Sequence, residues 1–306
     1  MNFEQIPKKT TEKEIPAEND IYKKARVWSD FFLKSYDFVK EEEIIEISPQ
    51  KVKDETPIFF SPGWGIKETS KSIMEVLANT ERKVISTFFS REESIINKKI
   101  KEDIPGAELQ KAFAIIEIIR KKSNKRTDAI GHSEGGLALA LAVSIRPDLF
   151  RNIVLIAPAG MMKNDSFWGL IGRFAIKEPY EEIKEGGLNM NIIGSYLKDI
   201  TLHYLKNRSL SSKEIKAMTQ MNVFEMTKYI KKQGIGVGLV CGTNDKVFPI
   251  EEVMKNIDNE NVDYFRSTKG NHSSIILSDE YKEYVLLAEK LLTIMARKKN
   301  LLTRKK

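Results

Sequence analysis

Short apolar runs alternate along this chain with longer stretches whose apolar residues recur at helical spacing. The apolar runs predict strands at 43–48, 56–61, 83–89, 127–131, 152–157, 234–241 and 262–266. The periodic stretches predict helices within 21–39 and over 69–80, 109–120, 137–143 and about 280–296. Strands and helices that alternate in this way indicate an α/β domain.

The region 161–233 departs from this pattern, because it has no clear strand and is rich in helical periodicity, methionine and aromatic residues. Ser211 and Glu214 have the spacing of a capping box in front of an apolar run, so we expect a helix to begin there. Two interpretations of the apolar side chains stay open. They form an adaptable lining for a pocket, or they attach this region to the rest of the domain.

The stretch 129–136 combines the end of a buried strand, a turn that carries Ser133 and the start of an Ala/Leu-rich helix. Gly131-x-Ser133-x-Gly135 is the spacing of a turn that presents a serine hydroxyl as a nucleophile. The flanking glycines allow strand and helix to approach closely. The N-terminus of the following helix has unpaired N–H groups that can stabilise an oxyanion. We therefore interpret Ser133 as a candidate nucleophile.

In these residues the sequence resembles the α/β-hydrolase superfamily, and especially its serine esterase and lipase-like members. The resemblance implies a mostly parallel sheet flanked by helices, with a helical cap inserted at 161–233 before the strand that carries the acid. It also implies an oxyanion hole made by the backbone N–H groups of Trp64 and Glu134. Pro62 departs from the family pattern, which usually has a histidine there. The resemblance implies no metal or organic cofactor, and Ser133, where other branches have aspartate, disfavours haloalkane and epoxide opening.

The chain has three histidines, and they differ in their predicted surroundings. His132 lies beside Ser133 in the turn and cannot reach around to it, and His203 falls in the predicted helical cap. His272 follows the last predicted strand, at the same end of the sheet as Ser133, so it is the candidate base. Asp245 lies in a loop after a buried strand, where the family places its acid, and Asp165 is the reserve candidate. The order Ser133, Asp245, His272 is the one expected of the fold.

These residues predict a serine hydrolase that transfers an acyl group from a small ester with an apolar acyl part to water, through an acyl-enzyme. A peptidase or amidase, an acyltransferase and a non-catalytic ligand-binding protein stay open as alternatives. The expected organisation is an N-terminal arm and helix, a core domain in two parts, a cap between those parts and a basic tail. The arm and helix span 1–45, the two parts of the core domain span 46–160 and 234–296, the cap spans 161–233, and the tail spans 297–306.

Charge and cysteine content add expectations about surroundings. The single cysteine, Cys241, excludes a disulfide framework, and residues 1–18 do not resemble a signal peptide, so we expect a cytoplasmic protein. Six basic residues in 297–306 account for most of the net charge of +7, which leaves +1 for the rest. This tail is a solvated terminus or a weak contact to an anionic membrane. No aromatic residues are interspersed among its charges, so we expect no nucleic-acid partner.

Overall fold

The core of the computed structural model is one seven-stranded sheet in the order β1-β3-β2-β4-β5-β6-β7. The structure describes residues 20–65, 69–89, 96, 104–162, 165–180, 198, 201–273 and 281–303. The strands are β1 (Ile44–Ile47), β2 (Ile58–Ser61), β3 (Val84–Thr87), β4 (Thr127–His132), β5 (Phe150–Ile156), β6 (Gly236–Gly242) and β7 (Tyr264–Thr268). Among the strand pairs that the structure describes, only the pairing of β1 with β3 is antiparallel. The mostly parallel sheet expected from the sequence is therefore confirmed.

Successive residues of the central strands point to opposite faces of the sheet, and both faces are buried. Phe59 of β2 and Ala129 of β4 belong to one apolar cluster, while Phe60 and Ile130, the next residues along, belong to the other. Burial on both faces explains why these strands are continuous apolar runs in the sequence. It also makes the register of each strand strongly specified, since a slip by one residue would exchange the two faces.

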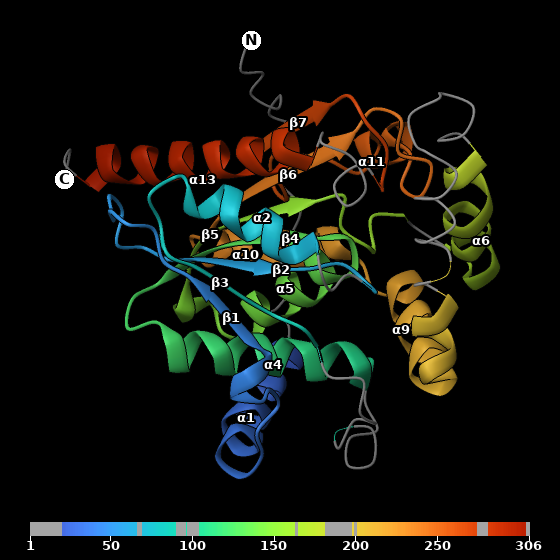
Figure 1. Ribbon diagram of the computed structural model, residues 1–306, viewed down its shortest axis with the longest axis horizontal. Coiled ribbons are helices and arrows are strands. Elements are labelled where there is room, and N and C mark those ends of the chain that lie inside the picture. Colours follow the sequence, from blue (N-terminus) through green and yellow to red (C-terminus); the bar gives the residue numbers. More distant parts are fainter. Residues whose placement is uncertain are drawn as a thin grey trace.

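Helices cover both faces of the sheet, as Figure 1 shows. On one face lie α1 (Asp20–Ser35), α4 (Gly106–Lys122), α5 (Ser133–Ile145) and α10 (Val223–Lys232), and on the other lie α2 (Thr69–Ala78) and α13 (Tyr281–Thr303). The shorter elements are η1 (Glu41–Glu43), η2 (Pro147–Leu149) and α11 (Ile250–Met254). The helix α5 is buried along its whole length, which fits its nearly uninterrupted alanine and leucine sequence.

The segment predicted to be a helical cap contains α6 (Phe167–Gly172), the π-helical turn η3 (Arg173–Lys177) and α9 (Arg208–Gln220), which stand together at one end of the molecule (Figure 1). The helix α10 follows them but packs against α5 and β6, beside the sheet. The cap prediction also included residues 181–197, which lie outside the described residues. Among the helices that the structure describes, none is long and apolar enough to cross a membrane.

Three local predictions differ from the structure. The helix α9 begins at Arg208 with Asn207 as its cap, so the capping box predicted at Ser211 and Glu214 is wrong. Asn207 accepts a hydrogen bond from the backbone of Leu210, and Glu214 is buried in the interior of the helix. The helix α4 begins earlier than expected, and α13 continues to Thr303, through most of the predicted tail. The predicted arm 1–19 and residues 304–306 lie outside the described residues.

Candidate active site

The turn between β4 and α5 holds Ser133 in a left-handed backbone conformation, with φ of 52°. This region is unfavourable for a residue with a side chain, and such strain is often found at functional sites. A Cβ atom on Gly135 would lie 2.1 Å from the carbonyl oxygen of Pro62, and one on Gly131 would lie 2.7 Å from Cα of Gly136. The two glycines are therefore required by close packing on both sides of the serine.

The structure brings Ser133, His272 and Asp245 together in one hydrogen-bonded chain. Nε2 of His272 lies 2.9 Å from Oγ of Ser133, and its Nδ1 lies 3.0 Å from Oδ2 of Asp245. The three residues follow β4, β7 and β6, whose carboxyl ends meet at one edge of the parallel sheet. All three are buried. The arrangement fits a nucleophile, a base and an acid that orients the base.

The carboxylate of Asp245 is fixed by its own loop. Its Oδ1 accepts hydrogen bonds from the backbone N–H groups of Val247 (2.8 Å) and Phe248 (2.7 Å), which leaves Oδ2 for His272. The reserve candidate Asp165 instead pairs with the guanidinium of Arg173, at 2.5 Å. The structure thus separates the two aspartates that the sequence left as alternatives.

The other two histidines occupy different surroundings. The ring of His132 is buried 5.3 Å from the ring of His272, and burial together with the charge of His272 lowers its pKa well below the usual value. His203 lies in the cap segment, where its ring packs edge-on against Trp64 at 4.7 Å. For His272, burial disfavours the charged form, but the neighbouring carboxylate of Asp245 outweighs it and raises the pKa.

A second carboxylate, Glu178, reaches the site from the end of the π-helical turn η3. Its Oε1 accepts a hydrogen bond from the backbone N–H of Ser273 (2.8 Å), and its Oε2 accepts one from that of Lys246 (3.1 Å). It therefore links the residue after Asp245 to the residue after His272. Burial and the nearby charge of Asp245 raise the pKa of Glu178 to about 7.

The turn after β2 packs directly against the turn that carries the serine. Gly135 contacts the carbonyl oxygens of Ser61 and Pro62, so Trp64 lies just beyond this contact. Glu134 is in the first turn of α5, where backbone N–H groups have no partner within the helix. The two residues expected to supply oxyanion donors therefore come from adjoining turns.

A cavity of about 380 Å³ opens over the serine. Ser133, His272, Thr201 and Tyr204 are its polar lining residues, and most of the others are apolar. The apolar ones include Phe167, Leu170 and Phe174 of α6 and η3, Ile215 and Met218 of α9, and Phe248 of the acid loop. This volume is within the range of pockets for small ligands. The interpretation of the cap side chains as a pocket lining is therefore supported at these positions.

Three functional candidates were missed by the sequence analysis: Glu178, Lys111 and Glu214. Glu214 was interpreted as part of a capping box. Lys111 is buried in α4, a helix in which most residues are apolar, and that context was the available signal. Glu178 lies in a polar stretch and gave no such signal. Among the described residues, no group of three or more His, Cys, Asp or Glu side chains is arranged to hold a metal ion.

Comparisons with known proteins identify the fold. No family model and no curated sequence matches the chain. Among solved structures, an esterase from Exiguobacterium antarcticum is similar, with a TM-score of 0.57, 14% identity and coverage of 83% of this chain and 94% of that chain. A structure whose description names carboxylesterases of Nitrososphaera gargenis has a TM-score of 0.57 and 14% identity, with 83% of this chain and 95% of that chain covered. A 2-hydroxy-6-oxo-6-phenylhexa-2,4-dienoate hydrolase from Rhodococcus has a TM-score of 0.54 and 15% identity, with 81% of this chain and 98% of that chain covered. The chain has the α/β-hydrolase fold.

Proposed function

We propose that this protein is a serine hydrolase that cleaves carboxylic esters with an apolar acyl group. The observation that carries the proposal is the unbroken chain from Oγ of Ser133 through the ring of His272 to Asp245, with distances of 2.9 and 3.0 Å. Esterases and other hydrolases among the structural neighbours are consistent with it, although their likeness establishes the fold alone.

The reaction begins when Nε2 of His272 takes the proton of Ser133 while Oγ attacks the ester carbonyl carbon. Asp245 accepts a hydrogen bond from Nδ1–H, which selects the tautomer with a free Nε2 and stabilises the imidazolium. The backbone N–H groups of Trp64 and Glu134 donate to the oxyanion. The imidazolium then protonates the departing alkoxide, and an acyl group stays on Ser133.

The second half repeats these steps with water as the nucleophile. His272 takes a proton from water, the hydroxyl attacks the acyl carbonyl, and Oγ of Ser133 leaves with the proton returned by the ring. The acyl group occupies the cavity formed with α6 and α9. Burial of apolar surface there favours esters with an apolar acyl group over esters with a small polar one. Amide hydrolysis or acyl transfer to another acceptor would use the same groups, so a substrate panel separates them.

Activity-based labelling tests the nucleophile. A fluorophosphonate probe is expected to add to wild-type protein at Ser133, as read by intact mass and peptide mapping. Ser133→Ala is expected to abolish labelling and to lower kcat on nitrophenyl esters by about 10⁵- to 10⁶-fold. Ser144→Ala, which changes another serine of α5, is the matched control and should keep activity. Wild-type protein that neither turns over esters nor takes the label would refute the proposal.

The same assay defines the acyl group. Along a series of nitrophenyl esters from acetate to decanoate, kcat/KM is expected to rise by at most about fourfold for each methylene buried in the cavity, and to fall once the cavity is full. A flat series would place the acyl chain outside the cavity. A panel of amide substrates then tests for amide hydrolysis. Ester or thioester substrates supplied together with acceptor alcohols test for acyl transfer.

A further inference from the structure

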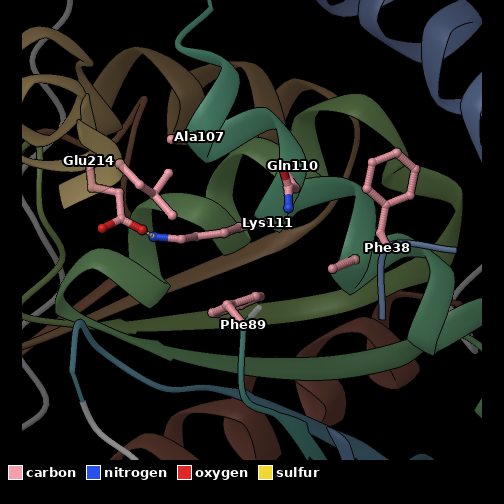
Figure 2. A pocket seen from close by; sticks show the side chains of 8 residues that line it. Phe38, Phe89, Ala107, Gln110, Lys111 and Glu214 are labelled. Carbon is pink, nitrogen blue, oxygen red and sulfur yellow. Dashed lines mark ion pairs between the residues drawn. The ribbon is translucent and has the colours of Figure 1, made fainter. Parts of the chain in front are cut away.

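A second cluster of buried charges lies beside the nucleophile and takes no part in the proton transfers described above. Lys111 of α4 is 6% exposed and is surrounded by three carboxyl groups. Its Nζ lies 2.8 Å from Oε1 of Glu214 and 3.6 Å from Oε1 of Glu108, and it contacts Oε1 of Glu134. Figure 2 shows Lys111 of α4 and Glu214 of α9 pointing toward one another.

Both proposed oxyanion donors belong to residues that this cluster holds. Glu134 supplies one donor through its backbone N–H, and its side chain contacts Lys111. Trp64 supplies the other, and its indole Nε1–H donates a 2.7 Å hydrogen bond to Oε2 of Glu214. Since Oε1 of Glu214 contacts Lys111, one ammonium group connects the side chains of both donor residues.

The connected residues come from parts of the chain that are far apart. Lys111 comes from α4, Glu134 from the turn at Ser133, Trp64 from the turn after β2, and Glu214 from the cap helix α9. Trp64 and Glu214 are 150 positions apart in the sequence. Their hydrogen bond therefore fixes the position of the cap relative to the turn that carries a donor.

Burial makes this arrangement expensive, which is an argument for a specific role. Ionised groups lose their hydration on burial, and apolar side chains of similar size often stabilise a fold as well or better. What apolar residues cannot supply is the fixed direction of a charged hydrogen bond to an indole N–H. Here the carboxylate of Glu214 fixes the direction of the indole N–H of Trp64, which follows Gly63 in the turn after β2.

We propose that Lys111 and Glu214 are positioning residues for the oxyanion hole. Lys111 orients Glu134 and Glu214, and Glu214 in turn holds the Trp64 indole so that both backbone N–H groups face the carbonyl oxygen of the substrate. The inference rests on the proposed function, since it concerns the same site. It implies that the oxyanion hole is complete only when the cap helix α9 is packed in the position that lets Glu214 contact Trp64.

A double-mutant cycle on the Trp64–Glu214 contact tests this role. Glu214→Gln keeps the shape of the side chain, but one amide cannot accept from both Lys111 and the indole. Trp64→Phe removes the indole N–H and keeps the backbone N–H. Each single variant is expected to lower kcat for a nitrophenyl acetate by about tenfold with KM nearly unchanged, because donor misplacement weakens transition-state binding. The double variant is expected to lose little more than either single variant.

Glu225→Gln, an exposed glutamate at the start of the next helix, is the matched control and should keep wild-type kcat. A Glu214→Gln variant with wild-type kcat, or single effects that multiply in the double variant, would overturn the inference and leave the proposed function standing. If Glu214→Gln does not fold, Trp64→Phe alone decides, and an unchanged kcat refutes the role. Wild-type protein that neither labels nor turns over esters would overturn both proposals.

The indole N–H resonances give a readout that does not depend on turnover. The chain has three tryptophans, so a proton–nitrogen spectrum shows three indole signals, and the one lost in Trp64→Phe belongs to Trp64. A hydrogen bond to a carboxylate moves that signal downfield, so it should move upfield in Glu214→Gln and stay in place in Glu225→Gln. A Trp64 signal that does not respond to Glu214→Gln would contradict the contact on which the inference depends.

Discussion

Two buried clusters of charge lie beside the turn that carries Ser133, one against Ser133 and the other against Glu134, and they are built from similar parts. One pairs the ring of His272 with Asp245, and the other pairs Lys111 with carboxyl groups that include Glu134. Each places a basic side chain among carboxylates, close to the serine turn. They differ in the basic residue, which is His272 in the first cluster and Lys111 in the second. Because of this difference, the first can transfer protons and the second can only hold its neighbours in position.

A base that takes part in catalysis must gain and lose a proton in every turnover. The ordinary pKa of histidine lies close to neutrality, and Asp245 raises that of His272 despite its burial, so both forms are accessible. Burial alone would lower the pKa of Lys111, but the charges of Glu108, Glu134 and Glu214 outweigh it and raise the pKa. Lys111 therefore keeps its proton throughout and can only orient its neighbours.

Asp245→Asn breaks the first cluster. It should lower kcat less than Ser133→Ala does, but more than any other change to the two clusters. An asparagine fits the loop, but it cannot stabilise the imidazolium and favours the wrong tautomer of His272, so kcat should fall about 10⁴-fold. Thermal unfolding should change little compared with this loss. Asp165→Asn, at the aspartate that pairs with Arg173, is the matched control and should retain activity. Equal losses in the two variants would contradict the assignment of the acid.

Lys111→Met breaks the second cluster, and its effect should appear first in stability. Removal of the ammonium leaves three carboxyl groups buried without their cation, which is expected to cost about 3–5 kcal/mol of unfolding free energy. The measurement is denaturant unfolding followed by far-UV circular dichroism. Lys216→Met, at an exposed position of α9, makes the same side-chain change in water and should leave the midpoint nearly unchanged. If Lys111→Met were as stable as the control, the second cluster would not hold the cap in place.

The sheet and the first cluster could be predicted from the sequence because their signals are local. A buried strand, a tight turn and a helix identify the position of Ser133, and parallel strands bring their carboxyl ends to one edge. A loop that follows such a strand therefore places its side chain at that edge. Asp245 and His272 each follow one. These positions, together with the resemblance to the α/β-hydrolase superfamily, predicted that the two side chains would meet, with Asp165 as the reserve candidate for the acid.

The second cluster could not be predicted in this way, because it depends on how the cap is seated. The spacing of Ser211 and Glu214 fits a helix start, but α9 begins earlier, and the same spacing falls inside the helix. Whether a glutamate there faces water or a buried lysine is decided by the packing of α9 on α4. No periodicity in a single helix contains that information.

Glu178→Gln makes the smallest change, to the carboxyl group that the cap brings to the first cluster. The negative charge of Glu178 favours the imidazolium form of His272, as that of Asp245 does. Without that charge the imidazolium is less stable and the pKa of His272 is lower. Since the base must be neutral to accept the proton of Ser133, the acid limb of kcat/KM should move to lower pH in the variant.

The measurement is a pH profile of kcat/KM on a nitrophenyl ester between about pH 5 and 9, a range that includes the ordinary pKa of histidine. The pKa of Glu178 itself is raised to about 7, so its charge develops within this range and should matter most in its upper half. Glu283→Gln, at an exposed position of α13, should leave the profile unchanged. A lower plateau with an unmoved acid limb would mean that Glu178 acts only through its hydrogen bonds to Lys246 and Ser273. The cap would then contribute geometry to both clusters and charge to the second alone.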